Sequence, residues 1–556
     1  MDFKQRATSL AGTSWHAIGR GFHAATAWIV EAIRKLRSVR VNLVIAVLLT
    51  ALGLLAFGAC AWWLIGFALT GNPTYSLPKG AETRGDATRI ALTIVAGLGG
   101  AVALVVTFRK QRRAEDGSFL ERLSIAADLL GGANPTMQVS GIYALAALAD
   151  ETHGTQRQQC IDVLCSYMRL PYSPTVANNL HPATTTTRRT YTFSDRTTEV
   201  QTTINHRPSD GEVRLTIIDV IRQHLQPEAM QSWSKNDFNF RESVFDGGSL
   251  AGALFQGAVD FTGATFIRRT MSFSFATFSG KVNFGLATFS GRVDFSDAWF
   301  SGGTVNFLDA LFTGGTVDFR RARFSGGTVQ FSFARFAGGS VSFARAMFTG
   351  SNIDFLHTKF SGGEVDFNEA MFSGGEADFS FASFSHGTVN FARTEFTGGT
   401  MIFIKTEFTG GNVNFAQAEF SGGDLRFGQA KFAGGKMRFG QAKFSGGKMH
   451  FFQAEFTGGE LDFGSAEFTG GELDFGLAEF TGSTLDFRLA KFTSGKVNFF
   501  QAEFTGGELD FGSAEFTGSN VDFRLPSAWK CPPLVPWDIH PPEGVVPQEL
   551  PFVWRR

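Results

Sequence analysis

Phenylalanine recurs along the second half of this chain at alternating spacings of seven and five residues. From Phe312 to Phe523 two phenylalanine columns run without interruption, each with 18 members. A fixed period this short indicates that each unit stacks on its neighbours, because a twelve-residue unit cannot bury its own apolar face. The repeat therefore decides the fold. Its invariant positions are apolar residues or glycine, which favours a structural role over a catalytic one.

Each twelve-residue unit consists of two five-residue blocks and two extra residues. In residues 317–328 the blocks are Val-Asp-Phe-Arg-Arg and Ala-Arg-Phe-Ser-Gly, followed by Gly-Thr. The small or aliphatic residue and the phenylalanine of a block lie two positions apart, so both point inward in extended backbone and the residue between them points to solvent. The Ser/Thr-Gly-Gly run predicts a corner, since glycine accepts the positive φ of tight turns.

Blocks such as residues 322–326 (Ala-Arg-Phe-Ser-Gly) and 466–470 (Ala-Glu-Phe-Thr-Gly) resemble pentapeptide repeats. Across about residues 238–525 the chain is similar to the membrane-linked, Phe- and Gly-rich proteins of that family in high-GC (actinobacterial) bacteria. The resemblance implies a right-handed quadrilateral β-helix with four blocks per coil, while the two-residue insertion leaves the regularity of two corners open. The inward ladder that we expect includes Phe312, Phe319, Phe324, Phe331, Phe336, Phe343, Phe463, Phe468, Phe475 and Phe480.

Four blocks with two insertions predict about 24 residues per coil, two units in all, and the alternative is a coil of one unit. Charge patterning discriminates between them, because like charges on stacked coils repel. The column that precedes the second phenylalanine runs from Glu395 to Glu515. Stacking each charge of this column on the one a single unit away gives 4 opposite-charge and 6 like-charge pairs. Stacking each on the charge two units away gives 6 opposite and 3 like. The sequence therefore favours the two-unit coil.

Two apolar segments precede the repeat and predict two transmembrane helices within residues 41–108. The first run covers 41–70 and the second covers 90–108, each long enough for a bilayer core. Basic residues flank the pair on the side of the N-terminal segment 1–40 and after residue 108, whereas the connecting loop 71–89 is less basic. The positive-inside rule then places both termini in the cytoplasm and that loop outside, in a two-pass protein of the bacterial cell (inner) membrane.

The remaining segments complete a predicted α plus all-β multi-domain chain. Residues 109–237 are expected to form a cytoplasmic helical linker with a flexible, Thr-rich loop at 173–211. The β-solenoid occupies 238–525, and Trp233 with the preceding helix is expected to cover its first coil. The Pro/Trp-rich segment 526–556 is either a cap on the last coil or a tail.

The search for chemistry-bearing residues predicts no catalytic site, no cofactor and no metal, so we do not expect an enzyme. The four cysteines are scattered without a metal-ligand or disulfide spacing, and Cys160 and Cys165 are interpreted as buried thiols. The glycine pairs recur in every unit and are corners rather than phosphate loops.

Surface charge is the more informative signal for function. Residues 451–525 carry 4 basic and 13 acidic residues, a net charge of −9, and a basic band precedes them. Phe333, Phe452 and Phe500 fall outside the core columns, and Phe452 and Phe500 are expected to lie on one side, two coils apart. The candidate interaction surface therefore comprises Arg426, Lys431, Lys436, Arg438, Lys443, Lys448, Phe452, Glu455, Glu467, Glu479 and Phe500.

These features predict a non-catalytic, membrane-anchored scaffold that presents a protein-interaction surface in the cytoplasm. The expected partners are the lipid bilayer and another protein whose identity the sequence does not give. Direct nucleic-acid binding is not expected, and self-association is left open. The alternative is suggested by family resemblance: a DNA-mimic-like modulator or protector of a type II topoisomerase.

Overall fold

The computed structural model describes residues 100, 103–111, 117–172, 183–193, 196–206, 210–524, 528–531, 533–537 and 541–546. The chain divides into two compact units, Met1–Leu120 and Glu121–Arg556. The segment 1–40, the first predicted membrane helix and the outside loop lie outside the described residues, as does most of the second predicted helix. Among the residues that are described, no helix combines the length and apolar composition that a membrane span requires.

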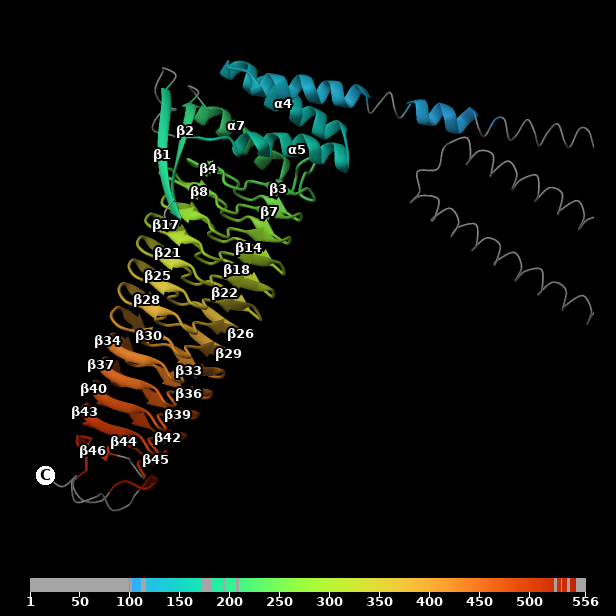
Figure 1. The fold of residues 1–556 in the computed structure, drawn as a ribbon. Helices are drawn as coiled ribbons and strands as arrows, with labels where there is room; N and C mark the ends of the chain where they lie inside the picture. The colour runs from blue at the N-terminus through green and yellow to red at the C-terminus, as the bar shows by residue number, and fades with distance from the viewer. Residues whose placement is uncertain are drawn as a thin grey trace, which may run out of the picture. The chain divides into compact units, whose positions relative to one another are not determined.

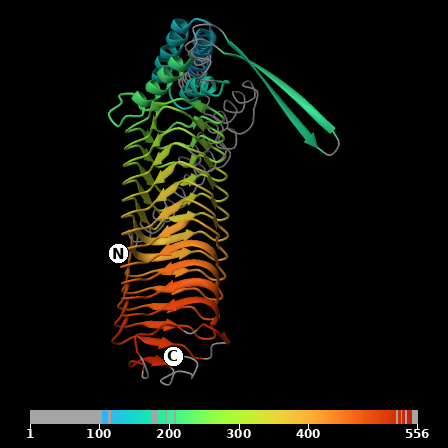
Figure 2. The ribbon, with the colours of Figure 1, turned by 90° about the vertical axis from the view of Figure 1, so that its left-hand side faces the viewer.

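From Phe238 onward the second unit winds into a right-handed β-solenoid of about 12 turns, with about 24 residues per turn (Figures 1 and 2). A representative turn consists of β18 (Arg323–Ser325), β19 (Thr328–Gln330), β20 (Arg335–Phe336) and β21 (Ser340–Ser342). Each strand pairs in parallel with the equivalent strand of the next turn, so that Phe324 lies opposite Phe348 and Phe336 opposite Phe360. The predicted two-unit coil is confirmed and the one-unit alternative is wrong.

The strands of every turn belong to two large parallel sheets. β18 and β19 belong to a 24-stranded sheet, called the first sheet below, and β20 and β21 belong to a 21-stranded sheet, called the second sheet. The Gly-Gly corner is a bend within one sheet rather than a break between sheets. In several C-terminal turns the two strands on either side of it fuse into one of eight residues: β26 (Met371–Asp378), β29 (Glu395–Ile402), β34 (Lys431–Arg438), β37 (Glu455–Asp462), β40 (Glu479–Asp486) and β43 (Glu503–Asp510). Each turn of the solenoid thus has two open corners, where the two extra residues are inserted. It also has two sharp corners, where nothing is inserted.

Stacked phenylalanines fill the interior of the solenoid. The rings of Phe312 and Phe336 stack with centroids 4.6 Å apart, and those of Phe319 and Phe343 are 4.8 Å apart. All ten phenylalanines of the expected inward ladder are buried. Full burial of one phenylalanine contributes about 1.5–3 kcal/mol, so the ladder is the main favourable term that holds the turns together.

The sharp corners contain a residue with positive φ that is not glycine. From Asp309 to Ser513 every twelfth residue has this conformation, for example Gln417 at 62° and Gln441 at 59°. Sequence reasoning assigned positive φ only to the Gly-Gly corners, where the second glycine does adopt it in most units, as Gly327 does at 78°. No Val, Ile or Thr occurs among the non-glycine residues with positive φ in the described part of the chain, because a branched Cβ is the least tolerated there.

In most units an aspartate or asparagine at the position before the first phenylalanine stabilises the sharp corner. The carboxylate of Asp318 accepts a hydrogen bond from the backbone N–H of Arg320, and Asp474 accepts one from Gly476. This is an Asx turn. The sequence interpretation of this column as solvated is therefore wrong for Asp318, Asp486 and Asp522, which are buried, whereas most of the other aspartates and asparagines of the column are only partly buried.

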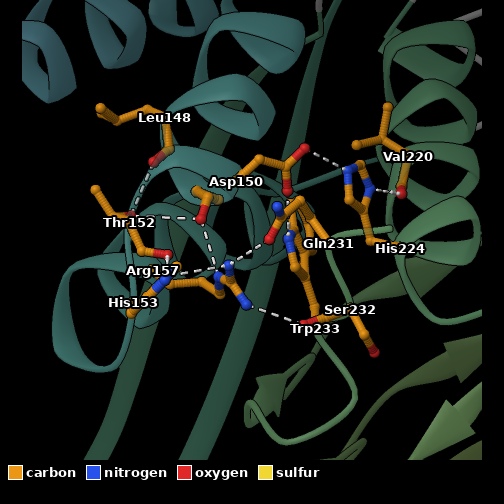
Figure 3. A network of polar contacts seen from close by, with 11 residues as sticks. Leu148, Asp150, Thr152, His153, Arg157, Val220, His224, Gln231, Ser232 and Trp233 are labelled. Carbon is orange, nitrogen blue, oxygen red and sulfur yellow. Dashed lines mark hydrogen bonds and ion pairs between the residues drawn. The ribbon is translucent and has the colours of Figure 1, made fainter. Parts of the chain in front are cut away.

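Three helices of the second unit lie at the first turn: α4 (Pro135–Glu151), α5 (Thr155–Met168) and α7 (Asp210–His224). The backbone N–H of Leu254 donates to the carbonyl of Leu225, and that of Gln256 donates to the carbonyl of Ser234. Trp233 is fully buried and joins the network of Figure 3. The first turn is therefore covered, as the sequence predicted. The two hydrogen bonds pair backbone groups at its strand edge that would otherwise be left without a partner strand.

Part of the predicted flexible loop 173–211 forms regular structure. The strands β1 (Ala183–Phe193) and β2 (Arg196–His206) pair as an antiparallel hairpin. The Thr-rich composition that suggested a loop is rich in β-branched residues, which favour extended backbone. The loop prediction is therefore corrected over these two strands.

The C-terminal segment continues the sheets beyond the last regular turn. β46 (Ala528–Trp529) pairs with β43, and β47 (Val545–Val546) pairs with β45 (Asn520–Asp522). The ring of Trp537 meets the ring of Phe516 edge-on, with centroids 5.3 Å apart. The described part of this segment therefore caps the final phenylalanines.

Candidate functional site: charged faces and a corner groove

No set of three or more His, Cys, Asp or Glu side chains is placed to hold a metal ion among the residues that the structure describes. Cys160 and Cys165 are buried in α5, and burial raises the pKa of their thiols to about 11 and about 12. Both cysteines therefore stay protonated and inert at neutral pH. The exterior charges and corners are the features that remain to be interpreted.

The structure divides the predicted interaction surface between the two sheets. The first sheet carries Arg426 in β33 (Asp424–Arg426), Lys443 in β35 (Lys443–Phe444), Lys448 in β36 (Lys448–His450) and Glu467 in β38 (Glu467–Phe468). The second sheet carries Lys431, Lys436 and Arg438 in β34, Glu455 in β37 and Glu479 in β40. The basic residues thus form a band around the solenoid rather than one face.

Most cations of this band lie against a carboxylate of the neighbouring turn. The nitrogen-to-oxygen distances are 3.3 Å for Lys431 and Glu455, 2.6 Å for Lys436 and Glu460, 3.0 Å for Lys443 and Glu419, and 3.5 Å for Lys448 and Glu472. Such exposed pairs contribute little to stability. They do, however, neutralise most of the band, so the band alone is not a strongly basic docking face.

The first sheet continues this alternation into the C-terminal turns. Lys491 lies in register between Glu467 and Glu515. Glu472 lies in register between Lys448 and Lys496 and is within 3.5 Å of both ammonium groups. Charges on this sheet therefore compensate one another from turn to turn.

The second sheet departs from this rule over the same turns. Its strands β37, β40 and β43 carry eight acidic residues and no lysine or arginine. Glu455, Glu479 and Glu503 lie in register with one another. The net acidity that the sequence places between 451 and 525 is thus concentrated on one sheet, where like charges face each other across neighbouring strands.

A groove of about 900 Å³ follows one sharp corner along these turns, and we call it the corner groove. Its two walls are residues that lie two positions apart within each turn. One wall consists of Lys405, Gln429, Gln453, Leu477 and Gln501, and the other consists of Glu407, Lys431, Glu455, Glu479 and Glu503; Phe381 lies at its N-terminal end. Sequence reasoning found Lys431, Glu455 and Glu479 but missed the groove, because their neighbours across it are set by the corner geometry.

Exposed rings form a ladder that leads into the corner groove. Phe333 stacks on His357 at a centroid distance of 5.1 Å, and His357 stacks on Phe381 at 5.0 Å. The ammonium of Lys405 lies 5.5 Å from the centroid of Phe381, a cation–π contact. Sequence reasoning identified Phe333 as a candidate outward residue but missed Phe381. The same two-turn spacing that aligned Phe452 with Phe500 also aligns these two.

Phe452 and Phe500 occupy the same column, two turns apart, as their spacing predicted. The backbone N–H of Gln453 donates to the carbonyl of Gly476, and that of Leu477 donates to the carbonyl of Phe500, which fixes this register. Phe452 is exposed and Phe500 is half-buried. Neither ring lines the corner groove.

Comparison with known families agrees with the coil geometry. Residues 273–320 match a family model described as pentapeptide repeats (9 copies). The matched blocks and the observed β-solenoid support a pentapeptide-repeat protein. Solenoids of this family are generally non-catalytic. No curated protein and no solved structure matches the chain. The pentapeptide-repeat fold is therefore the extent of the likeness, and its surface must be interpreted from its own residues.

Proposed function

We propose that this protein is a non-catalytic, membrane-anchored scaffold whose solenoid presents a protein-interaction surface in the cytoplasm. The supporting observation is that the two sheets differ in their charge pattern over the C-terminal turns. The first sheet balances its charges, as at Glu472 between Lys448 and Lys496, whereas the second sheet stacks Glu455, Glu479 and Glu503. A rigid backbone that holds like charges in register at a fixed spacing is suited to recognition rather than to turnover.

The anchoring part of the proposal rests on the sequence. The apolar runs at 41–70 and 90–108 have the length of bilayer-spanning helices, and the basic residues beside them favour cytoplasmic termini. Carbonate extraction of bacterial membranes tests it, and the full chain is expected to stay in the membrane pellet. Proteolysis of inside-out and right-side-out vesicles tests the orientation, with the solenoid cleaved only in the inside-out preparation. Release of the chain by carbonate would contradict the anchor.

Site-specific photo-crosslinking tests the scaffold. A crosslinking amino acid is placed at exposed positions of the full-length chain, one in the corner groove (Gln429) and one at the other sharp corner (Gln441). The expected result is a discrete crosslinked protein obtained from one corner and not from the other. Crosslinks that are absent at both corners, or equal and diffuse, would contradict a defined interaction surface.

The second candidate function is modulation or protection of a type II topoisomerase by mimicry of DNA charge. The observation that favours it is the run of acidic residues on β37, β40 and β43. The compensated first sheet of the same turns argues against a rod with two DNA-like faces. A supercoiling assay with the purified full-length chain separates the two proposals: protection of gyrase, with gyrase subunits among the crosslinked proteins, would replace the scaffold by this alternative.

A further inference from the structure

The sharp corner that the corner groove follows carries a large apolar side chain in almost every turn, and we call it the apolar corner. Each turn presents two adjacent residues there, the residue with positive φ and the residue before it. From the turn of Leu308 to the turn of Phe500 the apolar side chain alternates between these positions, as in Phe333 with positive φ and Leu356 in the position before. Within this range the turn of Gln429 alone lacks one. The apolar side chains are exposed or half-buried, so they form a line along the outside of the solenoid.

The other sharp corner of these turns does not have this pattern. Its positive-φ residues from Asp297 to Ser465 are all polar or charged. Arg321 lies 2.6 Å from Asp297, and Arg345 lies 2.8 Å from Glu369, so these cations are compensated within the chain. The same repeat builds both corners, so the fold does not require exposed apolar residues at either one. The apolar corner is therefore a candidate contact surface.

The apolar corner is self-complementary about Ile404. When a second copy lies alongside in the antiparallel direction, a two-fold axis brings each column opposite the same column, and turns equally far from the axis face each other. With the axis at Ile404, the apolar residues of the corner face one another in three pairs and Ile404 faces its own copy. The pairs are Leu356 with Phe452, Phe333 with Leu477, and Leu308 with Phe500.

The same arrangement fills the corner groove. The exposed rings that lead into the groove of one copy come opposite residues of the groove wall of the other copy. These pairs are Phe333 with Leu477, His357 with Gln453, and Phe381 with Gln429. Because the axis is two-fold, the ring ladder of each copy enters the groove of the other, and the contact forms twice in one pair of chains.

Charges beside the apolar corner face opposite charges in this arrangement. In the column two positions after the positive-φ residue, Arg335 and Glu479 are each three turns from the axis and come opposite each other. Among the residues that the structure describes, neither of them forms an ion pair within its own chain. Lys359 comes opposite Glu455 in the same column, and Glu455 keeps its own partner Lys431 at 3.3 Å.

The first-sheet side of the corner shows the same complementarity. Asp378 and Arg426 lie in register with Ile402, one turn to either side of it, so they come opposite each other across the axis. Two turns from the axis, Asp354 comes opposite His450. Opposite charges thus meet on both sides of the apolar line, and such complementarity fixes the register of two partners.

These charges select the position of the axis. The apolar pairs alone would also form with the axis one turn earlier or later, because their alternation has a period of two turns. An axis one turn earlier places Arg335 opposite Lys431, and an axis one turn later places Glu407 opposite Glu455. With the axis as placed here, like charges of the adjacent columns meet only at the axis itself. There Lys405 lies two positions from Glu407, so each ammonium can reach the carboxylate of the other copy.

The contact has the area that a pair of chains requires. From Leu308 to Phe500 the apolar corner extends over eight turns, about 38 Å at the strand spacing of a sheet. The residues from one flanking column to the other, such as Ile402 to Glu407, span at most about 17 Å. The contact therefore buries up to about 650 Å² on each copy, or about 1,300 Å² in total, which lies within the range of specific, stable interfaces.

We infer that two copies of this chain form an antiparallel dimer through the apolar corner, with the two-fold axis at Ile404. The inference goes beyond the scaffold function proposed above, because it identifies a second copy of the chain as one of its contacts. The N-terminal caps lie at opposite ends of such a pair. Two membrane-anchored copies would therefore lie along a bilayer rather than project from it.

Disulfide crosslinking tests the direction and the register of the pair. In the full-length chain Cys60→Ser and Cys531→Ser leave two native thiols, both buried. One preparation then receives Phe333→Cys and a differently tagged one receives Leu477→Cys. Oxidation of the mixture is expected to join the two chains, since a disulfide requires Cα atoms within about 7 Å. Phe333→Cys alone should not crosslink, because its two copies lie six turns apart, about 29 Å.

The control mixture is Arg345→Cys with Leu489→Cys, each one unit further along the chain and on the other sharp corner. Crosslinks in the control as strong as those of the test mixture would overturn the inference, since they indicate random collision. Crosslinking of Phe333→Cys to itself, without a mixed product, would also overturn it, because that result indicates a parallel pair.

Charge reversal tests the facing residues. The dissociation constant of the full-length dimer is measured by sedimentation equilibrium in detergent. Arg335→Glu and Glu479→Arg each bring like charges together twice in the pair and are expected to weaken it at least tenfold. The chain with both substitutions restores opposite charges and should return to within threefold of the wild type, which a misfolded variant would not do. Arg321→Glu, on the other sharp corner, should change the constant less than twofold. Failure of the double variant to recover, or a wild type that stays monomeric, would overturn the inference.

Two results separate this inference from the scaffold proposal. If the wild type is monomeric while photo-crosslinking at Gln429 captures a different protein, the dimer is wrong and the scaffold stands. If Gln429 crosslinks only to a second copy and neither corner captures another protein, the dimer stands and the proposed scaffold lacks its partner.

Discussion

The imidazole of His224 lies flat against the indole of Trp233, with ring centroids 4.0 Å apart and ring planes 15° apart. One carboxylate holds both rings. His224 Nε2 is 3.1 Å from one oxygen of Asp150, and Trp233 Nε1 donates to the other at 3.0 Å (Figure 3). Asp150 belongs to α4 and His224 to α7, so the pair ties two helices to the residue that covers the first turn. The cap is therefore a specific polar and aromatic network rather than a loose apolar cover.

Substitution of Trp233 is expected to destabilise the solenoid locally, at its first turns. Trp233→Ala removes a fully buried ring and should cost about 3–5 kcal/mol. Trp233→Phe keeps a ring but loses the bond to Asp150, for a cost of about 1 kcal/mol. Repeat proteins couple mainly to nearest neighbours, so amide hydrogen exchange should accelerate near Phe238–Phe266 and stay unchanged near Phe463–Phe511. A uniform acceleration along the solenoid would contradict a local cap.

Two adjacent glycines separate the effect of backbone conformation from that of close stacking. Gly326 and Gly327 both have positive φ, at 71° and 78°. A Cβ on Gly326 would meet no atom within 4 Å, whereas one on Gly327 would lie 2.2 Å from the carbonyl oxygen of Gly303 in the turn before. Gly326→Ala should therefore cost about 1–2 kcal/mol through φ alone. Gly327→Ala should cost about 1–3 kcal/mol more through overpacking.

Urea unfolding of the two glycine variants, followed by far-UV circular dichroism, measures this difference. The expected order of midpoints is wild type, Gly326→Ala, then Gly327→Ala. Equal midpoints for the two variants would show that neighbouring turns can separate enough to admit a methyl group.

The sharp corners should reject β-branched residues. Gln441 has φ of 59° and accepts a side-chain hydrogen bond from Gln417 in the preceding turn, at 2.9 Å. Gln441→Ala loses this exposed contact and should cost well under about 1 kcal/mol. Gln441→Val loses the same contact and forces a branched Cβ into the left-handed region, for a further cost of about 1–2 kcal/mol. Thermal unfolding of the pair tests the rule, and a valine variant as stable as the alanine variant would refute it.

The features that the sequence predicted are those carried by strict periodicity. The coil length follows from the alternation of charge along the Glu395 to Glu515 column, and the cap follows from the position of Trp233 directly before the first block. The features that were missed depend on local backbone geometry. Asp318 was assigned to solvent because its column alternates with inward residues, yet the tight turn brings its carboxylate onto the N–H of Arg320. The corner groove likewise exists only because the positive φ at residues such as Gln453 turns one wall to face the other.

Two like-charge pairs on one wall of the corner groove illustrate the same limit. Charge counting treated Glu455 with Glu479, and Glu479 with Glu503, as exceptions to the two-unit rule. In the structure these two of the three like-charge pairs lie on one wall of the corner groove, whereas the third, Glu395 with Glu419, lies on the first sheet; a count along the chain does not reveal this difference.

Acid should weaken the solenoid by protonating the partly buried aspartates of the Asx turns. Burial by itself would raise the pKa of Asp474, but the His450 imidazole 3.7 Å away and hydrogen bonds from the Gly476 backbone and Asn498 outweigh it and hold that pKa below its ordinary value. A lowered folded-state pKa contributes stability that is present above the unfolded pKa of about 4 and is lost as the pH falls through the folded value. Asp474→Asn keeps the turn, since Asn498 makes the same bond to Phe500, but it removes the charge. The wild type should therefore be more stable than Asp474→Asn at pH 6, with the difference in urea midpoint shrinking toward pH 3. Asp474→Ala also loses the turn, so it should be less stable than Asp474→Asn at every pH in this range. A wild-type advantage in urea midpoint that persisted unchanged at pH 3 would contradict the role assigned to the charge of Asp474.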